Sequence, residues 1–418
     1  MSKIVVMGQG YVGLPLAVRA VEAGHDVVGY EIDPTKVAEL NAGRSYVEDI
    51  DNDRLASVTG TGRYLATADT ADLAGFDIAV ISVPTPLNQG APDLTYMESA
   101  AVTIGEHLTE GACVILESTT YPGTTEELVG PLLAETSGLE MGSGFLLGYS
   151  PERIDPGNLT WRLENTPKVV AGINEASLVV VKEFYDSVVE TTVPVSGTRE
   201  AELTKLLENT FRHVNIALVN ELAMFSHDLG INIWEAIDAA STKPFGYMRF
   251  TPGPGVGGHC LPVDPSYLSW QVKRSLGRTF RFVELANEVN EHMPEYVVAR
   301  ISAALNRRSM PVRGSKVLLL GLAYKGNTGD ARESPSVPLS TNLLDLGADL
   351  RIADPHVHDR YVPEAAEQVQ LDESQLEWAD IIVFAVDHDA FDLDLIAGCG
   401  THVIDCRNKL IGPDIEQL

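Results

Sequence analysis

The sequence has few cysteines and no long apolar run, and each shortage excludes a class of protein. Four cysteines among 418 residues are too few for a disulfide framework in a chain of this size. No uncharged apolar stretch reaches the length of about 18 residues that a membrane-spanning helix needs. The first residues, MSKIVVMGQG, are typical of a β-strand that enters a glycine turn rather than of a signal peptide. We therefore expect a cytoplasmic protein.

Basic residues are also scarce. The chain has 30 Lys and Arg against 59 Asp and Glu, which gives a formal net charge of −29. A field of this sign repels phosphates at long range, so nucleic acid and anionic membranes are not expected as partners. The hydrophobic fraction of 44% is that of an ordinary globular protein, and the length suggests two or three domains.

Short β-branched runs alternate with helical segments in both halves of the sequence. They lie at 3–7, 26–30, 77–82, 112–118, 145–153 and 168–172, and again within 315–327 and at 348–354, 380–386 and 402–406. This alternation predicts βαβ units and parallel sheets. We predict an α/β fold in which two Rossmann-like, doubly wound parallel-sheet domains, 1–197 and 312–418, are joined through a central helical domain, 198–300.

A long central helix is predicted over 199–229, where large apolar residues recur at steps of three and four without Pro or Gly. This apolar face predicts a homodimer or a higher homo-oligomer. The helix also has a polar seam, in which Lys205 and Asn209 are followed by Arg212, His213 and Asn220. A buried Lys beside Asn is costly unless it meets an anion, but a solvated helix face explains the seam equally well.

A glycine motif stands between the first strand and the first helix. The motif, GQGYVG, comprises Gly8, Gly10, Tyr11, Val12 and Gly13. Such a turn lets a pyrophosphate approach the backbone and the helix N-terminus. Glu31, at the end of the second strand, suits ribose hydroxyls and repels a 2′-phosphate, so the pattern predicts NAD rather than NADP. Lys36 begins the next helix, where it either reaches a phosphate or stays solvated.

Cys260 lies in a glycine-dense loop, GPGVGGHCLPVDP, whereas Cys113 and Cys406 lie in apolar runs that predict buried free thiols. The loop backbone permits close approach of a ligand, so the Cys260 thiol is a candidate nucleophile; a buried structural Cys is the alternative. Asp264 follows four residues later and is a candidate for proton transfer. His259 is adjacent to Cys260, so its side chain is expected to point elsewhere.

No metal site is predicted, because His259, Cys260 and the pair His356 and His358 match no recognised zinc spacing. Loops after strands are the places where open α/β sheets bind ligands. Glu152 and Arg153 lie in one such loop, and Glu152 offers a carboxylate for general base chemistry.

Seven motifs occur in an order that resembles the UDP-glucose/GDP-mannose dehydrogenase family over essentially the whole chain. They are GQGYVGLP, SVPTP (82–86), ESTTYPGTT (117–125), SPERIDPGN (150–158), ELTKLLENTFRHVNIALVNE (202–221), GPGVGGHCLPVDP (253–265) and GLAYK with DARESP (321–335). The details SYVEDI, STTYPGTT and HCLPVDP most resemble the branch that oxidises UDP-N-acetylhexosamines, in particular UDP-N-acetylglucosamine.

The resemblance implies a four-electron oxidation of a C6 alcohol to a carboxylate, through a thiohemiacetal and a thioester on cysteine, with reduction of two NAD. The implied catalytic residues are Cys260, Lys205, Asn209, Asp264, Glu152 and Thr119. The implied cofactor contacts are the glycine motif with Glu31, Lys36, Thr85, Thr119 and Arg332. The implied contacts of the nucleotide sugar are Glu152, Arg153, Lys205, Asn209, Arg212, His213, Arg249, Phe250, Gly253, Gly257, Cys260 and Lys325.

Two departures separate the chain from the UDP-glucose branch of the family that it resembles. Val263 stands where those enzymes commonly carry a basic residue near the cofactor, and Pro156 stands where they have a glutamate that contacts the cofactor. A 6-dehydrogenase of UDP-glucose or of another nucleotide hexose nevertheless stays the first alternative, because the motifs do not fix the sugar. Two functions of other classes also stay open from the residues alone. A β-hydroxyacid dehydrogenase would share the glycine motif and the Lys-x-x-x-Asn helix, but it needs neither the Cys260 loop nor a second α/β half. A catalytically silent NAD-binding protein would leave that loop without a role.

Overall fold

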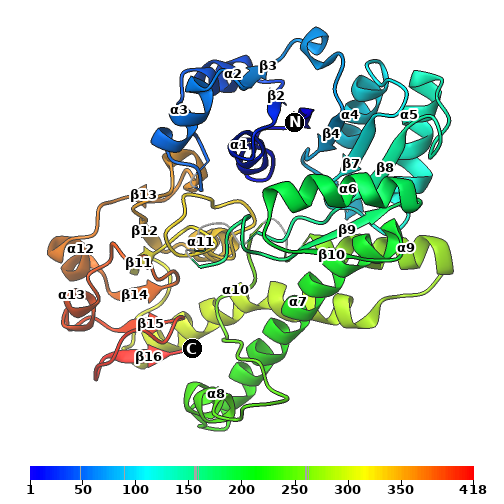
Figure 1. Ribbon diagram of the computed structural model, residues 1–418. Helices are drawn as coiled ribbons and strands as arrows, with labels where there is room; N and C mark the ends of the chain where they lie inside the picture. The colour runs from blue at the N-terminus through cyan, green and yellow to red at the C-terminus, as the bar shows by residue number, and fades with distance from the viewer. Residues whose placement is uncertain (48, 89, 155–157, 159, 259–260, 262) are drawn as a thin grey trace. The chain divides into compact units, whose positions relative to one another are not determined.

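The computed structural model covers residues 1–418 and describes all of them except 48, 89, 155–157, 159, 259–260 and 262 (Figure 1). The chain forms two compact units. Unit 1 comprises Met1–Glu208 and Ser266–Leu276, and unit 2 comprises Asn209–Pro265 and Gly277–Leu418. Helix α7, Thr198–Asp228, passes from unit 1 into unit 2 and confirms the predicted long helix, and α9, Asp264–Leu276, passes back.

Unit 1 contains an eight-stranded sheet in the order β10-β9-β8-β7-β4-β1-β2-β3. Its strands are β1 (Lys3–Met7), β2 (Asp26–Tyr30), β3 (Tyr64–Thr67), β4 (Ile78–Ile81), β7 (Cys113–Leu116), β8 (Leu146–Tyr149), β9 (Lys168–Gly172) and β10 (Thr192–Pro194). Pairing is parallel from β3 through β8, and the order of winding reverses between β1 and β4. This is the predicted doubly wound arrangement, whose ligand sites lie where the winding reverses.

One part of the predicted parallel sheet is wrong. Strand β9 pairs antiparallel with β8, with Gly148 opposite Gly172 and Tyr149 opposite Ala171. Two parallel neighbours need a crossover connection, and the described part of 150–167 contains no helix that could provide one. Because β9 runs backwards, its first residue, Lys168, lies at the carboxyl ends of the parallel strands.

Both faces of the unit 1 sheet are covered by helices. These helices are α1 (Gly13–Glu22), α2 (Pro34–Asn41), α3 (Asn52–Gly60), α4 (Thr95–Gly105), α5 (Gly130–Ser137) and α6 (Glu175–Val188). Alternate residues of a strand point to opposite faces, so Ile4 and Val6 join one hydrophobic cluster while Val5 and Met7 join another. A strand buried on both faces reads as a continuous apolar run, which is why KIVVM was recognisable in the sequence.

Unit 2 contains a six-stranded, fully parallel sheet in the order β13-β12-β11-β14-β15-β16. Its strands are β11 (Lys316–Leu320), β12 (Asp349–Ala353), β13 (Glu367–Gln368), β14 (Ile381–Phe384), β15 (Val403–Asp405) and β16 (Ile415–Gln417). Its further helices are α8 (Ile233–Ser241), α10 (Arg281–Arg307), α11 (Ser336–Asp345), α12 (Glu373–Trp378) and α13 (Leu393–Ala397). The second Rossmann-like domain is therefore confirmed, although the 27-residue helix α10 was not anticipated (Figure 1).

The cysteine predictions are confirmed for Cys113 and Cys406, which are buried free thiols. Burial raises the pKa of each thiol to about 12, so neither is a nucleophile at neutral pH. Among the described residues, no helix combines the length and apolar character needed to cross a membrane.

Candidate functional site

The three glycines of the turn after β1 have two different roles. A Cβ at Gly13 would lie 1.9 Å from the carbonyl oxygen of Gly8, and Gly8 itself has φ of +87°. These two glycines are needed by the turn itself, because any side chain at Gly13 would collide with backbone. A Cβ at Gly10 would meet nothing within 4 Å. The space beside Gly10 is therefore open to a ligand, as close approach of a pyrophosphate requires.

Glu31 lies at the turn, immediately after β2. One of its carboxylate oxygens accepts a hydrogen bond from Gln9 N at 3.3 Å, and the other accepts from Asp33 N at 3.2 Å. Tyr46 donates its hydroxyl to Gln9 O at 2.7 Å, and the Lys36 ammonium lies 5.2 Å from the centre of the Tyr46 ring. The predicted acidic and basic residues thus both stand beside the glycine turn, and they fit the ribose and phosphates of NAD.

Substitution by Ala separates the two roles of the glycines. Gly10→Ala is expected to weaken NAD binding at least about tenfold without lowering the unfolding temperature, because the new methyl fills only ligand space. Gly13→Ala is expected to cost about 1–3 kcal/mol of folding free energy, because the methyl overlaps the Gly8 carbonyl. Calorimetric titration with NAD and thermal unfolding of both variants would check this. Unchanged NAD affinity in Gly10→Ala would contradict the assignment.

Two other predicted cofactor contacts lie at strand ends of unit 1. Thr85 is buried, and its carbonyl oxygen accepts a hydrogen bond from the Tyr267 hydroxyl at 2.5 Å. Thr119 is half-buried in the loop after β7. Both positions are at the carboxyl edge of the sheet, where ligands of this fold bind.

The loop after β7 is attached to α7 by Glu202, a residue that the sequence did not single out. The Glu202 carboxylate is fully buried and accepts hydrogen bonds from the backbone N–H groups of Gly123 and Thr125 and from the Thr125 hydroxyl, at 2.5, 2.9 and 2.6 Å. Burial raises its pKa to about 7 although these bonds oppose the shift. Glu202 thereby holds the Thr119 loop against the first turns of α7.

Lys205 follows one turn later on α7 and is only 7% exposed. No hydrogen bond or ion pair of its ammonium group is found within the described part of the chain. A buried, unpaired ammonium is unfavourable by itself, so the arrangement suits a site in which a negative ligand or oxyanion completes the pairing.

Asn209 and Asp264, which are far apart in sequence, are brought together in unit 2. The Asn209 amide donates to the Asp264 carboxylate at 2.6 Å, and Asp264 is 2% exposed at the start of α9. A carboxylate held by such a hydrogen bond has a fixed orientation. Cys260, predicted as the nucleophile, lies outside the described residues, so its role stays a prediction.

The loop that precedes Cys260 is held by a buried amide chain between α7 and α10. Asn220 is fully buried; its oxygen accepts from Gly253 N at 3.0 Å, and its nitrogen donates to Asn290 at 2.9 Å. A Cβ at Gly257 would lie 2.8 Å from both Tyr324 and Pro335. The glycines of this loop therefore allow it to pack closely against the chain that follows β11.

Arg407 was missed by the sequence analysis. It follows β15, and its guanidinium donates to Ala385 O at 2.6 Å while another of its nitrogens lies 3.3 Å from the Cβ position of Gly253. The half-buried cation therefore faces the predicted substrate loop. Its place in DCRN directly after an apolar strand is the signal that could have identified it.

Several predicted substrate or cofactor cations have protein partners instead of open positions. Arg153 pairs with Glu208 at 2.6 Å, Arg249 with Asp238 at 2.8 Å and Arg332 with Asp330 at 2.8 Å. Each would have to exchange this partner in order to bind a phosphate, so their ligand contacts stay predictions. Lys325 is half-buried and also has an interaction within the protein.

The remaining predicted contacts lie on or beside α7. His213 is 1% exposed and its ring contacts Asn287 at 2.7 Å, so the described contacts of this ring are internal, and burial lowers its pKa. Arg212 is exposed. Phe250 packs edge-to-face on Phe211, with 5.8 Å between ring centres.

The second sheet has a carboxylate where Glu31 stands in the first. Asp354 follows β12, and one of its oxygens accepts from Leu322 N at 2.7 Å, Ala323 N at 2.9 Å and the ring of His388 at 3.0 Å. Burial favours the neutral acid, but the hydrogen bonds hold the pKa of Asp354 at about 2. These contacts occupy the carboxylate, so this turn is not arranged as a second dinucleotide site.

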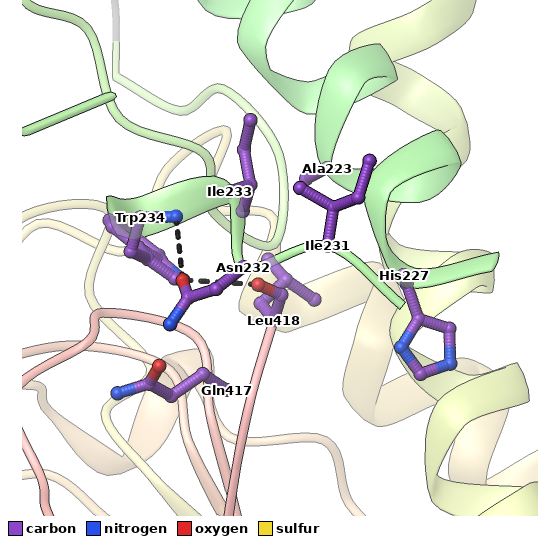
Figure 2. A pocket seen from close by; sticks show the side chains of 8 residues that line it. All are labelled: Ala223, His227, Ile231, Asn232, Ile233, Trp234, Gln417 and Leu418. Carbon is purple, nitrogen blue, oxygen red and sulfur yellow. Dashed lines mark hydrogen bonds between the residues drawn. The ribbon is translucent and has the colours of Figure 1, made fainter. Parts of the chain in front are cut away.

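A cavity of about 180 Å³ lies in unit 2 between α7, α8 and the end of the chain, and it contains none of the predicted site residues. Figure 2 shows Trp234 beside Leu418, whose carbonyl oxygen accepts a hydrogen bond from the indole nitrogen at 3.0 Å. Pockets for ligands of drug size have about 300–1,000 Å³, so this cavity is too small for a nucleotide sugar.

Comparison with known proteins decides between the alternative functions that the sequence left open. Family models match the chain in three consecutive parts: the NAD binding domain of the UDP-glucose/GDP-mannose dehydrogenase family over residues 2–189, its central domain over 199–292 and its UDP binding domain over 318–411. The chain belongs to this family. It is an NAD-dependent dehydrogenase of nucleotide sugars, and the β-hydroxyacid and silent alternatives are set aside.

Individual relatives agree with this assignment. The chain is 36% identical to a UDP-N-acetyl-D-mannosamine dehydrogenase of Pyrococcus horikoshii over 99% of its own length and 97% of the relative. It is 37% identical to a UDP-N-acetyl-D-glucosamine 6-dehydrogenase of Pseudomonas aeruginosa over 85% and 83%. The solved structure of a UDP-D-ManNAc dehydrogenase from Pyrococcus horikoshii superimposes with a TM-score of 0.90, at 35% identity and 99% and 98% coverage.

Proposed function

We propose that this dehydrogenase oxidises the C6 hydroxyl of UDP-N-acetylglucosamine to the uronic acid, with reduction of two NAD for each sugar. The observation that carries the proposal is the polar group on α7. Lys205 is buried without a described partner, and one turn later Asn209 is bonded to Asp264, four residues after Cys260. A cation and an amide so placed suit an oxyanion that forms on a cysteine adduct.

The proposed reaction has two oxidation steps and one hydrolysis step. NAD, when bound, accepts a hydride at each of the two oxidation steps. The Cys260 thiolate adds to the C6 aldehyde, and Lys205 and Asn209 stabilise the resulting alkoxide. Oxidation of this adduct leaves a thioester, which water cleaves to the carboxylate and the free thiolate. Glu152 takes the proton of that water, Thr119 positions the water, and Asp264 assists proton transfer.

UDP-N-acetylmannosamine is the second candidate substrate. It is favoured by the Pyrococcus horikoshii relative, which is named for this sugar and matches the chain nearly end to end. The two sugars differ only in configuration at C2. One pocket therefore decides between the two sugars.

The test is a panel of UDP-N-acetylglucosamine, UDP-N-acetylmannosamine, UDP-N-acetylgalactosamine and UDP-glucose, each incubated with the purified protein and NAD. The expected result is the highest kcat/KM with UDP-N-acetylglucosamine and two NADH for each uronate formed. One NADH per sugar would contradict the cysteine mechanism, and preference for UDP-N-acetylmannosamine would establish the second candidate.

We also propose that the protein is a homodimer or a higher homo-oligomer through α7. Six large apolar side chains of this helix, and Leu229 directly after it, are exposed in the single chain; the six are Leu203, Leu207, Phe211, Leu218, Leu222 and Phe225. Apolar exposure on this scale along one helix is typical of a surface that another chain covers. A monomer mass in light scattering would contradict this proposal. The cytosol is the proposed compartment, and the free thiols Cys113, Cys399 and Cys406 suit its reducing conditions.

A further inference from the structure

A buried cluster of ionisable side chains lies at the carboxyl edge of the unit 1 sheet, next to Glu152. It comprises Glu117 after β7, Lys168 at the start of β9 and Tyr185 on α6, a helix that packs against β7, β8 and β9. The proposed chemistry uses none of these three residues. The cluster exists because β9 runs antiparallel, which brings Lys168 to the strand ends that carry Glu117 and Glu152.

Glu152 is fixed at both of its carboxylate oxygens. One accepts the backbone N–H groups of Arg153 and Ile154, each at 2.6 Å, and the other lies 3.3 Å from the Lys168 ammonium. Its side chain is 9% exposed. Lys168 is therefore the only described side chain found to contact this carboxylate, and it limits where the second oxygen can point.

Glu117 competes with Glu152 for the same cation. One Glu117 oxygen lies 2.7 Å from the Lys168 ammonium and accepts the Tyr185 hydroxyl at 2.5 Å, so its contact with the cation is shorter than that of Glu152. Its other oxygen is buried and has no hydrogen-bond partner among the described residues. One ammonium group thus faces two carboxyl groups inside the protein.

The energetics of such a cluster depend on how the single positive charge is shared. Burial raises the pKa of Glu117, and the attraction of Lys168 only partly opposes this shift. Burial also opposes ionisation of Lys168, but the two carboxylates together raise its pKa. Lys168 is therefore a cation at neutral pH, and whatever charge Glu117 carries reduces the field that Lys168 exerts on Glu152.

We propose that Lys168 and Glu117 are positioning residues that set the orientation of Glu152 and the positive field that acts on it. Lys168 holds the Glu152 carboxylate in place, and Glu117 takes up part of the positive charge that would otherwise act on Glu152 alone. The importance of this arrangement for turnover rests on the proposed role of Glu152 as the base in thioester hydrolysis; the sharing of the cation does not.

Two substitutions in the cluster are expected to act in opposite directions. In Glu117→Gln, the full charge of Lys168 acts on Glu152, so the titration midpoint of Glu152 should be lower than in the wild type. In Lys168→Met, the stabilising cation is gone, so the midpoint should be higher than in the wild type. A role in packing alone predicts loss of stability without opposite shifts.

The measurement is a pH titration of the glutamate carboxyl carbons by NMR in the full-length protein, with Glu152→Gln to identify the signal. The acidic limb of the kcat profile is recorded in parallel and is expected to move in the same two directions. Lys182→Met, which removes an exposed lysine paired with Asp186 on α6, is the matched control and should leave both readouts unchanged.

Tyr185→Phe provides a milder change that keeps the charge of the cluster. It removes a hydrogen-bond donor that favours the ionised form of Glu117, so Glu117 carries less negative charge and takes up less of the positive charge of Lys168. The titration midpoint of Glu152 should therefore fall, by less than in Glu117→Gln. If Lys168→Met does not fold, Tyr185→Phe decides the question. A lower Glu152 midpoint in this variant supports the proposal, and an unchanged midpoint overturns it.

Shifts of the same sign, or none, in Glu117→Gln and Lys168→Met would also overturn the proposal. Opposite NMR shifts without uronate formation by the wild type would instead refute the proposed function and leave the shared cation established.

Discussion

Cys260→Ala is expected to bind NAD as tightly as the wild type and to form no uronate. Without the thiol no covalent adduct of the aldehyde forms, so the second oxidation has no thiohemiacetal to act on. Loss of a catalytic nucleophile costs several orders of magnitude in rate, and we expect a fall of at least about 10⁴-fold in kcat. The measurement is NADH formation together with chromatographic detection of the uronate.

Cys399→Ala is the matched control for this experiment. Cys399 is a half-buried free thiol of the same unit, which neither the motif nor the geometry assigns to the site. Its variant should keep wild-type turnover. Full uronate formation by Cys260→Ala would rule out the covalent mechanism and would leave the glycine-dense loop with a structural role.

Lys205→Met is expected to lower kcat by about 10²–10³-fold, the usual cost of removing one stabilising group from an oxyanion site. The folded protein should be as stable as the wild type or more stable. The reason is that the wild-type ammonium is buried without a described partner, and an apolar side chain of similar length removes this unfavourable burial. The affinity for NAD should not change.

The combination of lower activity with undiminished stability distinguishes catalysis from packing. Thermal unfolding and steady-state kinetics of the same preparation provide both values. Lys273→Met, at an exposed position of α9, serves as the control. A Lys205→Met variant that loses stability but keeps kcat would mean that the lysine supports the helix rather than the reaction.

The periodic parts of the fold were accessible from the sequence because burial imposes a pattern on it. KIVVM, DVVGY and KVVAG were located as strands, since residues covered on both faces must be apolar along the whole strand. The short edge strands β3 and β13 were missed, because one of the four residues of β3 is exposed and neither residue of β13 is buried. The extent of α10 was missed because Pro294 interrupts the usual helical signal.

The residues of the candidate site also fall into those that the sequence predicted and those that it missed. Candidate site residues within a motif, such as Glu31 and Asp264, were named in advance, because their position relative to a glycine turn or a loop is local information. Glu202 and Arg407 were not named, because each acts through a backbone group or loop that is distant in sequence.

The sequence by itself determined the two Rossmann-like sheets, the glycine turn and the family, since these follow from apolar patterns and from contiguous motifs. The orientation of β9 was decided only by the tertiary structure. The apolar residues VVAG of β9 satisfy both faces of the sheet in either strand direction, and only the connection and the pairing with β8 choose between the two directions. That choice places Lys168 beside Glu117 and Glu152, so the buried charge cluster is a product of the fold.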